Sequence, residues 1–213
     1  KRKKPINLTN NNGSALINYT VLIGVDYDSD MNADFSDLRF TDTDQVTDID
    51  FYVETFVLSD SAIVWVEVPS IPAAGTYIFM YYGNPAAASA SNFSNTFPDA
   101  LIVDGATVTL GGLEQHDWIE VRNGGVINIT SGSILQLEAR RIIVDGTSSI
   151  NGNGRGNSGG ARATSCGMQN NGTGSGAGTG GYSTGNSDGP GGGGAGYGGA
   201  GGGGGGAWGT SDN

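Results

Sequence analysis

The sequence predicts an all-β protein: an N-terminal antiparallel β-sandwich of a jelly-roll-like kind, then a short β-solenoid, then a glycine-rich segment. Three observations lead to this fold class. Short apolar or alternating stretches in the first ~97 residues are separated by clusters of Gly, Pro, Asn and Asp. Five apolar residues between positions 118 and 150 stand eight apart. From position 151 to position 213 nearly half of the chain is glycine, which leaves few side chains to bury.

Residues 1–97 form the predicted β-sandwich. The basic cluster Lys1-Arg2-Lys3-Lys4 is followed by Pro5, and we interpret it as a solvated terminus, with an interaction arm as the alternative. The clearest alternation begins at Ile63 and ends before Pro69. Residues 86–90 are small and suit a linker or a short turn of helix. The predicted strands cover residues 16–25, 37–41, 49–58, 63–68 and 76–82.

Residues 98–156 form the predicted short solenoid. The apolar residues that stand eight apart each begin a short strand-like stretch, and turn residues such as Asn123-Gly124-Gly125 lie between the stretches. The sequence Ile-Val-Asp-Gly at residues 102–105 recurs at residues 143–146. Three strands of this spacing give a coil of ~24 residues. A meander of hairpins is the alternative, because it has a similar turnover. The residues that stand eight apart are Trp118, Val126, Ile134, Ile142 and Ile150.

Residues 157–213 form the predicted glycine-rich segment, which packs on the solenoid or extends it. A solenoid has open ends whose strand edges can pair further, so this segment serves either as a cap or as a contact surface in an assembly. Three aromatic residues interrupt the glycine tract, Tyr182, Tyr197 and Trp208. They can pin glycine strands together or stack on sugars.

Composition narrows the function classes. The chain has a net charge of −11 with only 15% charged residues, which argues against nucleic-acid binding because no basic stripe neutralises phosphates. No apolar run approaches the ~20 residues of a membrane span. Abundant Gly, Ser, Thr, Asn and Asp at low charge is typical of secreted β-proteins. We therefore expect an extracellular or cell-surface protein.

Three separated motifs in the N-terminal region carry a family resemblance. They are residues 31–42 (MNADFSDLRFTD), residues 63–73 (IVWVEVPSIPA) and residues 81–85 (YYGNP). In this order they resemble a prokaryotic family known only as a domain of unknown function, over roughly residues 1–92. The resemblance implies a β-sandwich module of large secreted and cell-surface proteins, with no established catalytic residues. The segment after Asp44 departs from it by lacking the usual turn glycine. The solenoid and glycine-rich region also resemble surface β-helix proteins in texture.

The best candidate metal site is an acidic run in the first motif. Counted from Asp26, oxygen-bearing residues fall at positions 1, 3, 5, 7, 9 and 12, which is the spacing of a calcium loop. Met31 stands where the sharp turn needs glycine, and Asp37 is shorter than the usual bidentate Glu. A solvated acidic loop is therefore the alternative to calcium. The candidate ligands are Asp26, Asp28, Asp30, Asn32, Asp34 and Asp37.

Catalysis finds little support in the sequence, and we expect no enzymatic activity. The one histidine, His116, has no nucleophile motif around it and is interpreted as a surface residue. Zinc needs more His and Cys ligands than the chain has, and no other cofactor is expected. The carboxylates of Glu120 and Glu138 could lie on one face as a glycosidase pair, but so short a solenoid offers little groove for a sugar chain.

Two further sets of residues are candidate sites for glycans. Three tryptophans, Trp65, Trp118 and Trp208, are candidates for stacking on sugars. Six Asn-X-Ser/Thr sequences exceed chance expectation and permit glycosylation in a secreted protein. The candidate acceptors are Asn7, Asn12, Asn18, Asn92, Asn128 and Asn171.

The sequence therefore favours an extracellular structural protein, a self-assembling subunit of a cell-surface filament, fibre or layer. Assembly into a homo-polymer would use solenoid ends, an N-terminal strand inserted into a neighbour, or glycine-rich contacts. The alternative is a carbohydrate-binding or adhesion module of a larger secreted surface protein. A fibre subunit polymerises without ligand, whereas an adhesion module stays monomeric and binds glycans.

Overall fold

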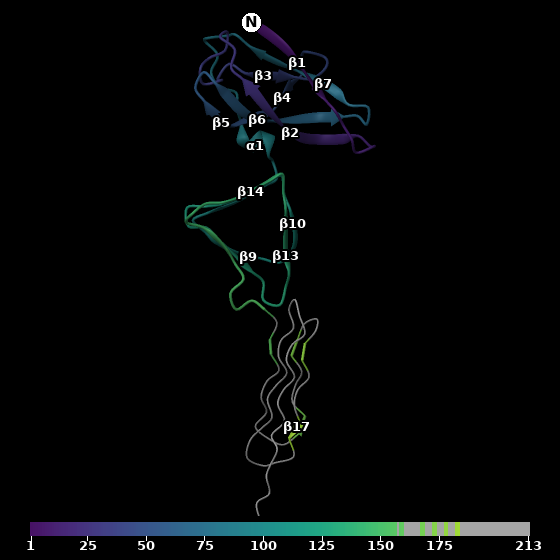
Figure 1. Ribbon diagram of the computed structural model, residues 1–213, viewed down its shortest axis with the longest axis vertical. Coiled ribbons are helices and arrows are strands. Elements are labelled where there is room, and N and C mark those ends of the chain that lie inside the picture. The colour runs from purple at the N-terminus through teal and green to yellow at the C-terminus, as the bar shows by residue number, and fades with distance from the viewer. Residues whose placement is uncertain (157, 160–166, 169–171, 174–176, 179–181, 184–213) are drawn as a thin grey trace, which may run out of the picture. The chain divides into compact units, whose positions relative to one another are not determined.

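The structure, a computed structural model, describes residues 1–156, 158–159, 167–168, 172–173, 177–178 and 182–183. The chain divides into two compact units, Lys1–Pro98 and Asp99–Asn213, each considered by itself below. The described residues contain many strands and one helix of four residues, so the predicted all-β class is confirmed (Figure 1). No helix in the described part is long and apolar enough to cross a membrane.

Unit 1 consists of two antiparallel sheets. The first has the order β1-β7-β3-β4, formed by Arg2–Leu8, Thr76–Tyr82, Arg39–Thr41 and Asp48–Ile49. The second has the order β2-β6-β5, formed by Leu16–Asp26, Ser61–Ile71 and Phe51–Val57. All pairings in both sheets are antiparallel, as predicted for this region.

The two sheets share one hydrophobic core because strand side chains alternate between faces. In β6, Val64, Val66 and Val68 are fully buried, and in β7 Ile78 and Met80 point into the same cluster. Apolar side chains of the long connection between β2 and β3 complete the core. These are Met31, Phe35 and Leu38.

One prediction for unit 1 is wrong, the end of a strand before Pro69, and one strand was not predicted. The basic terminus is exposed, but it also forms strand β1, which pairs with β7 from Arg2 to Leu8. Pro5 is tolerated there because β1 is an edge strand, where a missing N–H leaves no ladder bond unmade. Strand β6 continues through Pro69 to Ile71, and the ladder with β2 omits the pair between Pro69 and Asn18, whose φ is +46°.

The helix α1 (Phe93–Thr96) lies shortly after residues 86–90, for which the sequence allows a helical turn. The Asn92 side chain caps it by accepting a hydrogen bond from the Asn95 N–H. Its aromatic residues pack against β5 and β6. The Phe93 ring is 5.1 Å from that of Tyr52, centroid to centroid, and the Phe97 ring is 5.7 Å from that of Trp65.

Unit 2 is built from short strands that pair in parallel (Figure 1). They form three sheets with the orders β14-β11-β8, β15-β12-β9 and β10-β13. Because hairpins produce antiparallel neighbours, this pairing excludes the alternative meander of hairpins. The strands β8 to β15 are Ala100–Asp104, Thr107–Leu110, Gly112–Gln115, Trp118–Arg122, Val126–Ile129, Leu135–Glu138, Arg141–Val144 and Ser149–Asn151. A further antiparallel pair joins β16 (Gly167–Met168) and β17 (Tyr182–Ser183).

The register of unit 2 explains the recurrence in the sequence. Glu120 of β11 pairs with Ile102 on one side and with Ile143 on the other, so the two Ile-Val-Asp-Gly segments flank the same strand. The paired residues Asp104 and Arg122 stand 18 positions apart, whereas Gln115 and Glu138 in the following step stand 23 apart. Only the second step is close to the predicted ~24. Apolar side chains therefore stack in rows, and the core of unit 2 contains Val103, Val121 and Ile127.

Candidate functional site

The acidic run between β2 and β3 is a structured loop. Its backbone forms successive turns, in which the Met31 N–H bonds to the Asp28 carbonyl at 2.8 Å and the Phe35 N–H to the Asn32 carbonyl at 2.9 Å. Phe35 is 1% exposed and adopts a φ of +58°, a conformation that its burial in the core holds in place. The loop is therefore anchored by its apolar residues, and its carboxylates are placed by that anchoring.

Asp37 is the most buried carboxylate of this loop, at 2% exposure. One oxygen accepts the Asn32 N–H at 2.9 Å, and the other accepts the N–H groups of Gly83 at 2.6 Å and Asn84 at 3.2 Å. Asp37 thus fastens the loop to the turn after β7, joining the first and third sequence motifs. Arg39 donates to the carbonyls of Ser36, Leu38 and Ala88 instead.

The remaining carboxylates of the loop also have partners within the protein. Asp28 accepts the Asp30 N–H at 2.9 Å and the Tyr82 hydroxyl at 3.1 Å, and the first of these lowers the pKa of Asp28 most. Asp30 forms an ion pair with Arg2, and Asp34 accepts the Ser36 N–H.

These contacts bear on the predicted calcium site. Among the residues that the structure describes, no group of three or more His, Cys, Asp or Glu side chains is arranged to hold a metal ion. Three of the loop's carboxylates, those of Asp28, Asp34 and Asp37, accept backbone N–H groups instead. Calcium binding stays a prediction that this geometry does not favour, and the carboxylates serve the local fold.

The sequence-predicted tryptophans are poorly placed for sugar stacking. Trp65 is 6% exposed, and its indole N–H donates to Glu54 at 2.7 Å. Trp118 is 2% exposed, with the Arg141 guanidinium 6.0 Å from its ring centroid. A sugar ring needs an open aromatic face, and neither indole offers one. Trp208 lies outside the described residues.

Most of the glycosylation candidates lie at the surface. Asn7, Asn12, Asn18 and Asn92 are exposed, so these four can meet a glycosyltransferase. Asn128 is half-buried on β12, and its side-chain oxygen accepts the Asn151 amide at 3.2 Å. Asn171 lies outside the described residues.

The residues considered for catalysis are not assembled as a site. His116 contacts two carboxylates, with Nδ1 3.2 Å from Asp99 and Nε2 3.8 Å from Glu114. Glu120 and Glu138 lie in different sheets of unit 2. The first contacts Trp118 and Arg122, and the second contacts Gln115 and Gln136.

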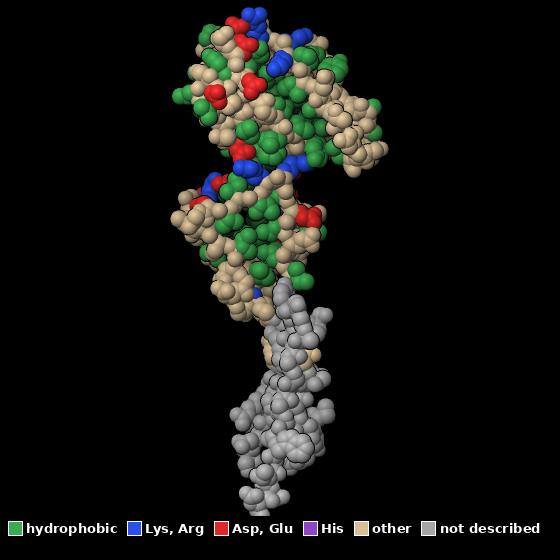
Figure 2. Space-filling model, in the orientation of Figure 1, with side chains coloured by type: hydrophobic (Ala, Val, Ile, Leu, Met, Phe, Trp, Pro, Cys, Tyr) green, Lys and Arg blue, Asp and Glu red, His purple; other side chains and the backbone are tan. Residues whose placement is uncertain are grey.

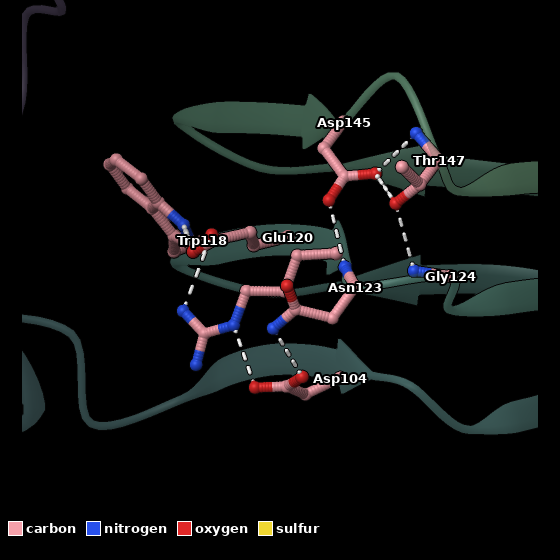
Figure 3. A network of polar contacts seen from close by, with 8 residues as sticks. Asp104, Trp118, Glu120, Asn123, Gly124, Asp145 and Thr147 are labelled. Atoms are coloured by element: carbon pink, nitrogen blue, oxygen red, sulfur yellow. Dashed lines mark hydrogen bonds and ion pairs between the residues drawn. The ribbon is translucent and has the colours of Figure 1, made fainter.

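A polar network joins the turns that follow β8, β11 and β14 (Figure 3). Asp104 accepts the Arg122 Nε–H at 2.9 Å and the Asn123 side-chain amide at 2.8 Å. Asp145 accepts the Asn123 backbone N–H at 2.7 Å and the Thr147 hydroxyl at 2.8 Å. The Asn123 amide lowers the pKa of Asp104, and the Asn123 N–H lowers the pKa of Asp145 well below its usual range. The network stabilises the stacking of successive turns.

Sequence reasoning missed an aromatic stripe on the solvent face of the first sheet. Since β7 alternates, its core residues leave Tyr77, Phe79 and Tyr81 on the opposite face, with Tyr77 43% exposed. The Tyr77 and Phe79 rings meet edge to face at 5.4 Å. The ammonium groups of Lys1 and Lys3 lie over Tyr81 at 4.9 Å and over Phe79 at 4.8 Å. The sequence of residues 76–82 could have predicted the stripe, because alternation places every second residue of a strand, here Tyr77, Phe79 and Tyr81, on the face away from the core.

Comparison with known families adds one finding. A domain of unknown function (DUF2341) is found at residues 34–109, which include β3 to β8 and most of β9. The match begins in the acidic loop and passes the boundary between the units at Pro98. It differs in extent from the predicted resemblance over residues 1–92. No curated protein and no solved structure matches the chain.

Proposed function

We propose that this chain is an extracellular structural protein, a self-assembling subunit of a cell-surface filament, fibre or layer. One observation carries the proposal. Among the described strands of unit 2, β13, β14 and β15 are paired on one side only, as β8, β9 and β10 are at the opposite edges of the same sheets. Apolar side chains of β14 and β15 are open, with Ile142, Val144 and Ile150 exposed by 45%, 40% and 41%.

The exposed apolar residues of β14 and β15 continue rows of side chains whose preceding members, on β11 and β12, are buried. Ile142 pairs with Ile119 and Ile150 pairs with Ile127, and both earlier residues are 0% exposed. The rows and the three parallel sheets support a short parallel β-solenoid in unit 2. In unit 1 the proposal includes a jelly-roll-like sandwich. An end of such a stack presents unpaired backbone groups and an apolar surface, which together are a template for one more coil. We assign that coil to a second copy of the chain.

Two other strand edges, those of β1 and β5, are less suited to assembly. The β1 edge carries Lys3, Lys4 and Pro5, which are residues that discourage edge-to-edge pairing. The β5 edge has a register shift between Val53 and Thr55. Strand β1 is already used in its own sheet, which disfavours its insertion into a neighbour. Assembly through glycine-rich contacts involves residues outside the described part of the chain.

The extracellular location is supported by surface chemistry. Four predicted glycosylation sites are exposed in unit 1, and low charge with many turn-forming residues suits a secreted β-protein.

Electron microscopy with a matched pair of variants tests the proposal. We expect filaments or sheets of the purified protein in negative stain after prolonged incubation. Ile150→Lys places a charge in the open end and should abolish them, because an unpaired charge cannot be buried in the next coil. Leu113→Lys changes a somewhat more exposed apolar residue, 53% exposed on β10 against 41% for Ile150, away from that end and should leave assembly intact. Wild-type protein that stays monomeric, or equal loss in both variants, would contradict the proposal.

A further inference from the structure

We propose that the solvent face of β1, β7 and β3 binds carboxylate-bearing saccharides. Tyr77, Phe79 and Tyr81 would lie beneath the sugar rings, and Lys1, Lys3 and Arg39 would pair with the carboxylates. We call this surface the stripe face. The inference goes beyond the assembly function and does not depend on it, because the stripe face belongs to unit 1 and the proposed assembly contact to unit 2.

The aromatic rings of the stripe face are not needed by the core. Core packing in β7 uses Ile78, Met80 and Tyr82, which are 0%, 3% and 9% exposed. The three rings on the other face extend over about 13 Å of strand, at roughly 3.3 Å per residue. A row of this length suits an extended oligomer better than a single sugar. Amphipathic rings on a rigid strand provide contact area at little entropic cost.

Cations flank the stripe on both sides. Lys1 and Lys3 come from β1 and the residue before it, and Arg39 comes from β3, where it pairs with Tyr81 in the ladder. Both lysines are exposed, so their ammonium groups can reach a ligand, although Lys3 must first release the Gln45 side-chain oxygen, to which it donates at 2.6 Å. In Figure 2 Lys and Arg side chains of unit 1 are visible near its N-terminal end, on a chain that is otherwise acidic.

Arg39 is the best-positioned cation of the stripe face. Its guanidinium is held by the carbonyls of Ser36 at 3.2 Å, Leu38 at 2.5 Å and Ala88 at 2.7 Å. No carboxylate within the described residues forms an ion pair with it. Beside it lies a hollow of about 420 Å³, lined by Lys1, Asp37, Arg39, Tyr81, Tyr82, Gly83, Asn84 and Ala87. The Asp37 carboxylate there is already satisfied by three backbone N–H groups.

The cations of the stripe face, together with the negative net charge of the chain, indicate which class of ligand it binds. A fixed guanidinium with two exposed ammonium groups recognises carboxylates, and the rings add contact that only a ligand with flat apolar faces can use. A densely charged polyphosphate would be repelled by a chain of net charge −11. Sparse carboxylates on a sugar chain avoid most of that repulsion. An acidic protein surface is the other possible occupant, and the test below distinguishes it.

The test measures binding of tetragalacturonic acid by calorimetry at low salt, with its fully methyl-esterified form as the uncharged probe. We expect the acid to bind and the ester to bind at least about tenfold more weakly, since each charge-assisted contact is lost. Lys3→Ser should weaken binding about fivefold to tenfold. Lys4→Ser removes the same charge from the opposite face of the same strand and should leave binding unchanged. Tyr81→Ser should weaken binding of the acid, with thermal unfolding as the check that the fold persists.

Several outcomes would overturn the inference. Failure of the acid to bind at all would exclude this ligand class and leave an acidic protein as the occupant. Equal binding of the acid and the ester would show that Lys1, Lys3 and Arg39 do not recognise the carboxylates. Equal effects of Lys3→Ser and Lys4→Ser would place the binding elsewhere or make it non-specific. Each measurement is made on monomeric protein, so loss of filament formation affects none of them.

Discussion

At the scale of single residues, the acidic loop shows how the same side chains can suit two roles. Six oxygen-bearing residues have the spacing of a calcium loop, yet three of them, Asp28, Asp34 and Asp37, accept hydrogen bonds from backbone N–H groups. Asp30 instead pairs with Arg2, and the Asn32 side-chain amide donates to Ser36. The decisive residue is Phe35. Its side chain enters the core with a left-handed backbone, which turns the loop so that Asp37 faces the end of β7.

Replacement of Asp37 tests this view of the loop. Asp37→Asn keeps one acceptor oxygen but sets an amide NH₂ against backbone N–H donors, so we expect a loss of about 2 kcal/mol in the free energy of unfolding. Urea denaturation of unit 1 measures it. The control is Asp34→Asn, an exposed loop carboxylate, which should cost less than about 0.5 kcal/mol. Equal costs for the two variants would contradict the fastening role of Asp37.

At the scale of elements, the stacked turns of unit 2 depend on close backbone approach. A Cβ added at Gly125 would lie 2.3 Å from the Val103 carbonyl oxygen and 3.0 Å from that of Arg122. Gly146 stands in the following turn, and a Cβ there meets nothing within 4 Å. Two turn glycines in the same stack thus differ in their tolerance of a side chain, although the local sequence does not distinguish them.

The pair of glycines provides a direct test of the stacking. Gly125→Ala must push one turn away from the next, and we expect it to destabilise unit 2 by about 3 kcal/mol. Gly146→Ala should change stability by no more than about 0.5 kcal/mol. Thermal unfolding followed by circular dichroism compares the two. If Gly125→Ala unfolds like the wild type, the turns are not stacked in this register.

At the scale of the whole molecule, the net charge of −11 and the hydrogen-bonded carboxylates oppose each other as pH falls. Protonation relieves general repulsion, but it also breaks specific hydrogen bonds. The pKa is lowered by hydrogen bonds from neighbouring groups at five aspartates of the described residues, Asp28, Asp34, Asp44, Asp104 and Asp145. At ordinary salt, repulsion between exposed charges is screened beyond about 8 Å, so the hydrogen bonds dominate.

Acid should therefore destabilise both units. Since these carboxylates have a lower pKa in the folded protein than in the unfolded chain, their stabilisation is complete above about pH 4 and is lost as pH falls through the folded values. We expect the melting temperature in 0.15 M salt to be level from about pH 7 to pH 5 and to fall below about pH 4. Asp145→Asn should make the fall of the melting temperature of unit 2 with acid less steep, because the lowered pKa of Asp145 no longer contributes to it. A melting temperature that rises on acidification would show that relief of repulsion prevails.

Much of the fold follows from local patterns in the sequence. Apolar and aromatic runs located β7 at its observed limits and β2 to within one residue. The eight-residue spacing led to a coil length close to the step from Gln115 to Glu138 but longer than the step from Asp104 to Arg122. The candidate sites were predicted less well. The burial of Trp65 depends on Phe97, which lies in a different part of the chain, and the partners of Asp37 follow it by 46 and 47 residues.

By itself, the sequence determined the all-β class, the places of most strands and the recurrence that becomes parallel stacking. These depend on the period of side chains along one strand or one coil, which neighbouring residues encode. Only the tertiary structure decided that the basic terminus is a strand beside β7, that Trp65 and Trp118 are buried, and that the Tyr77–Phe79–Tyr81 stripe faces solvent. Each of these outcomes depends on which distant segment packs against a given face, and no local spacing specifies that partner.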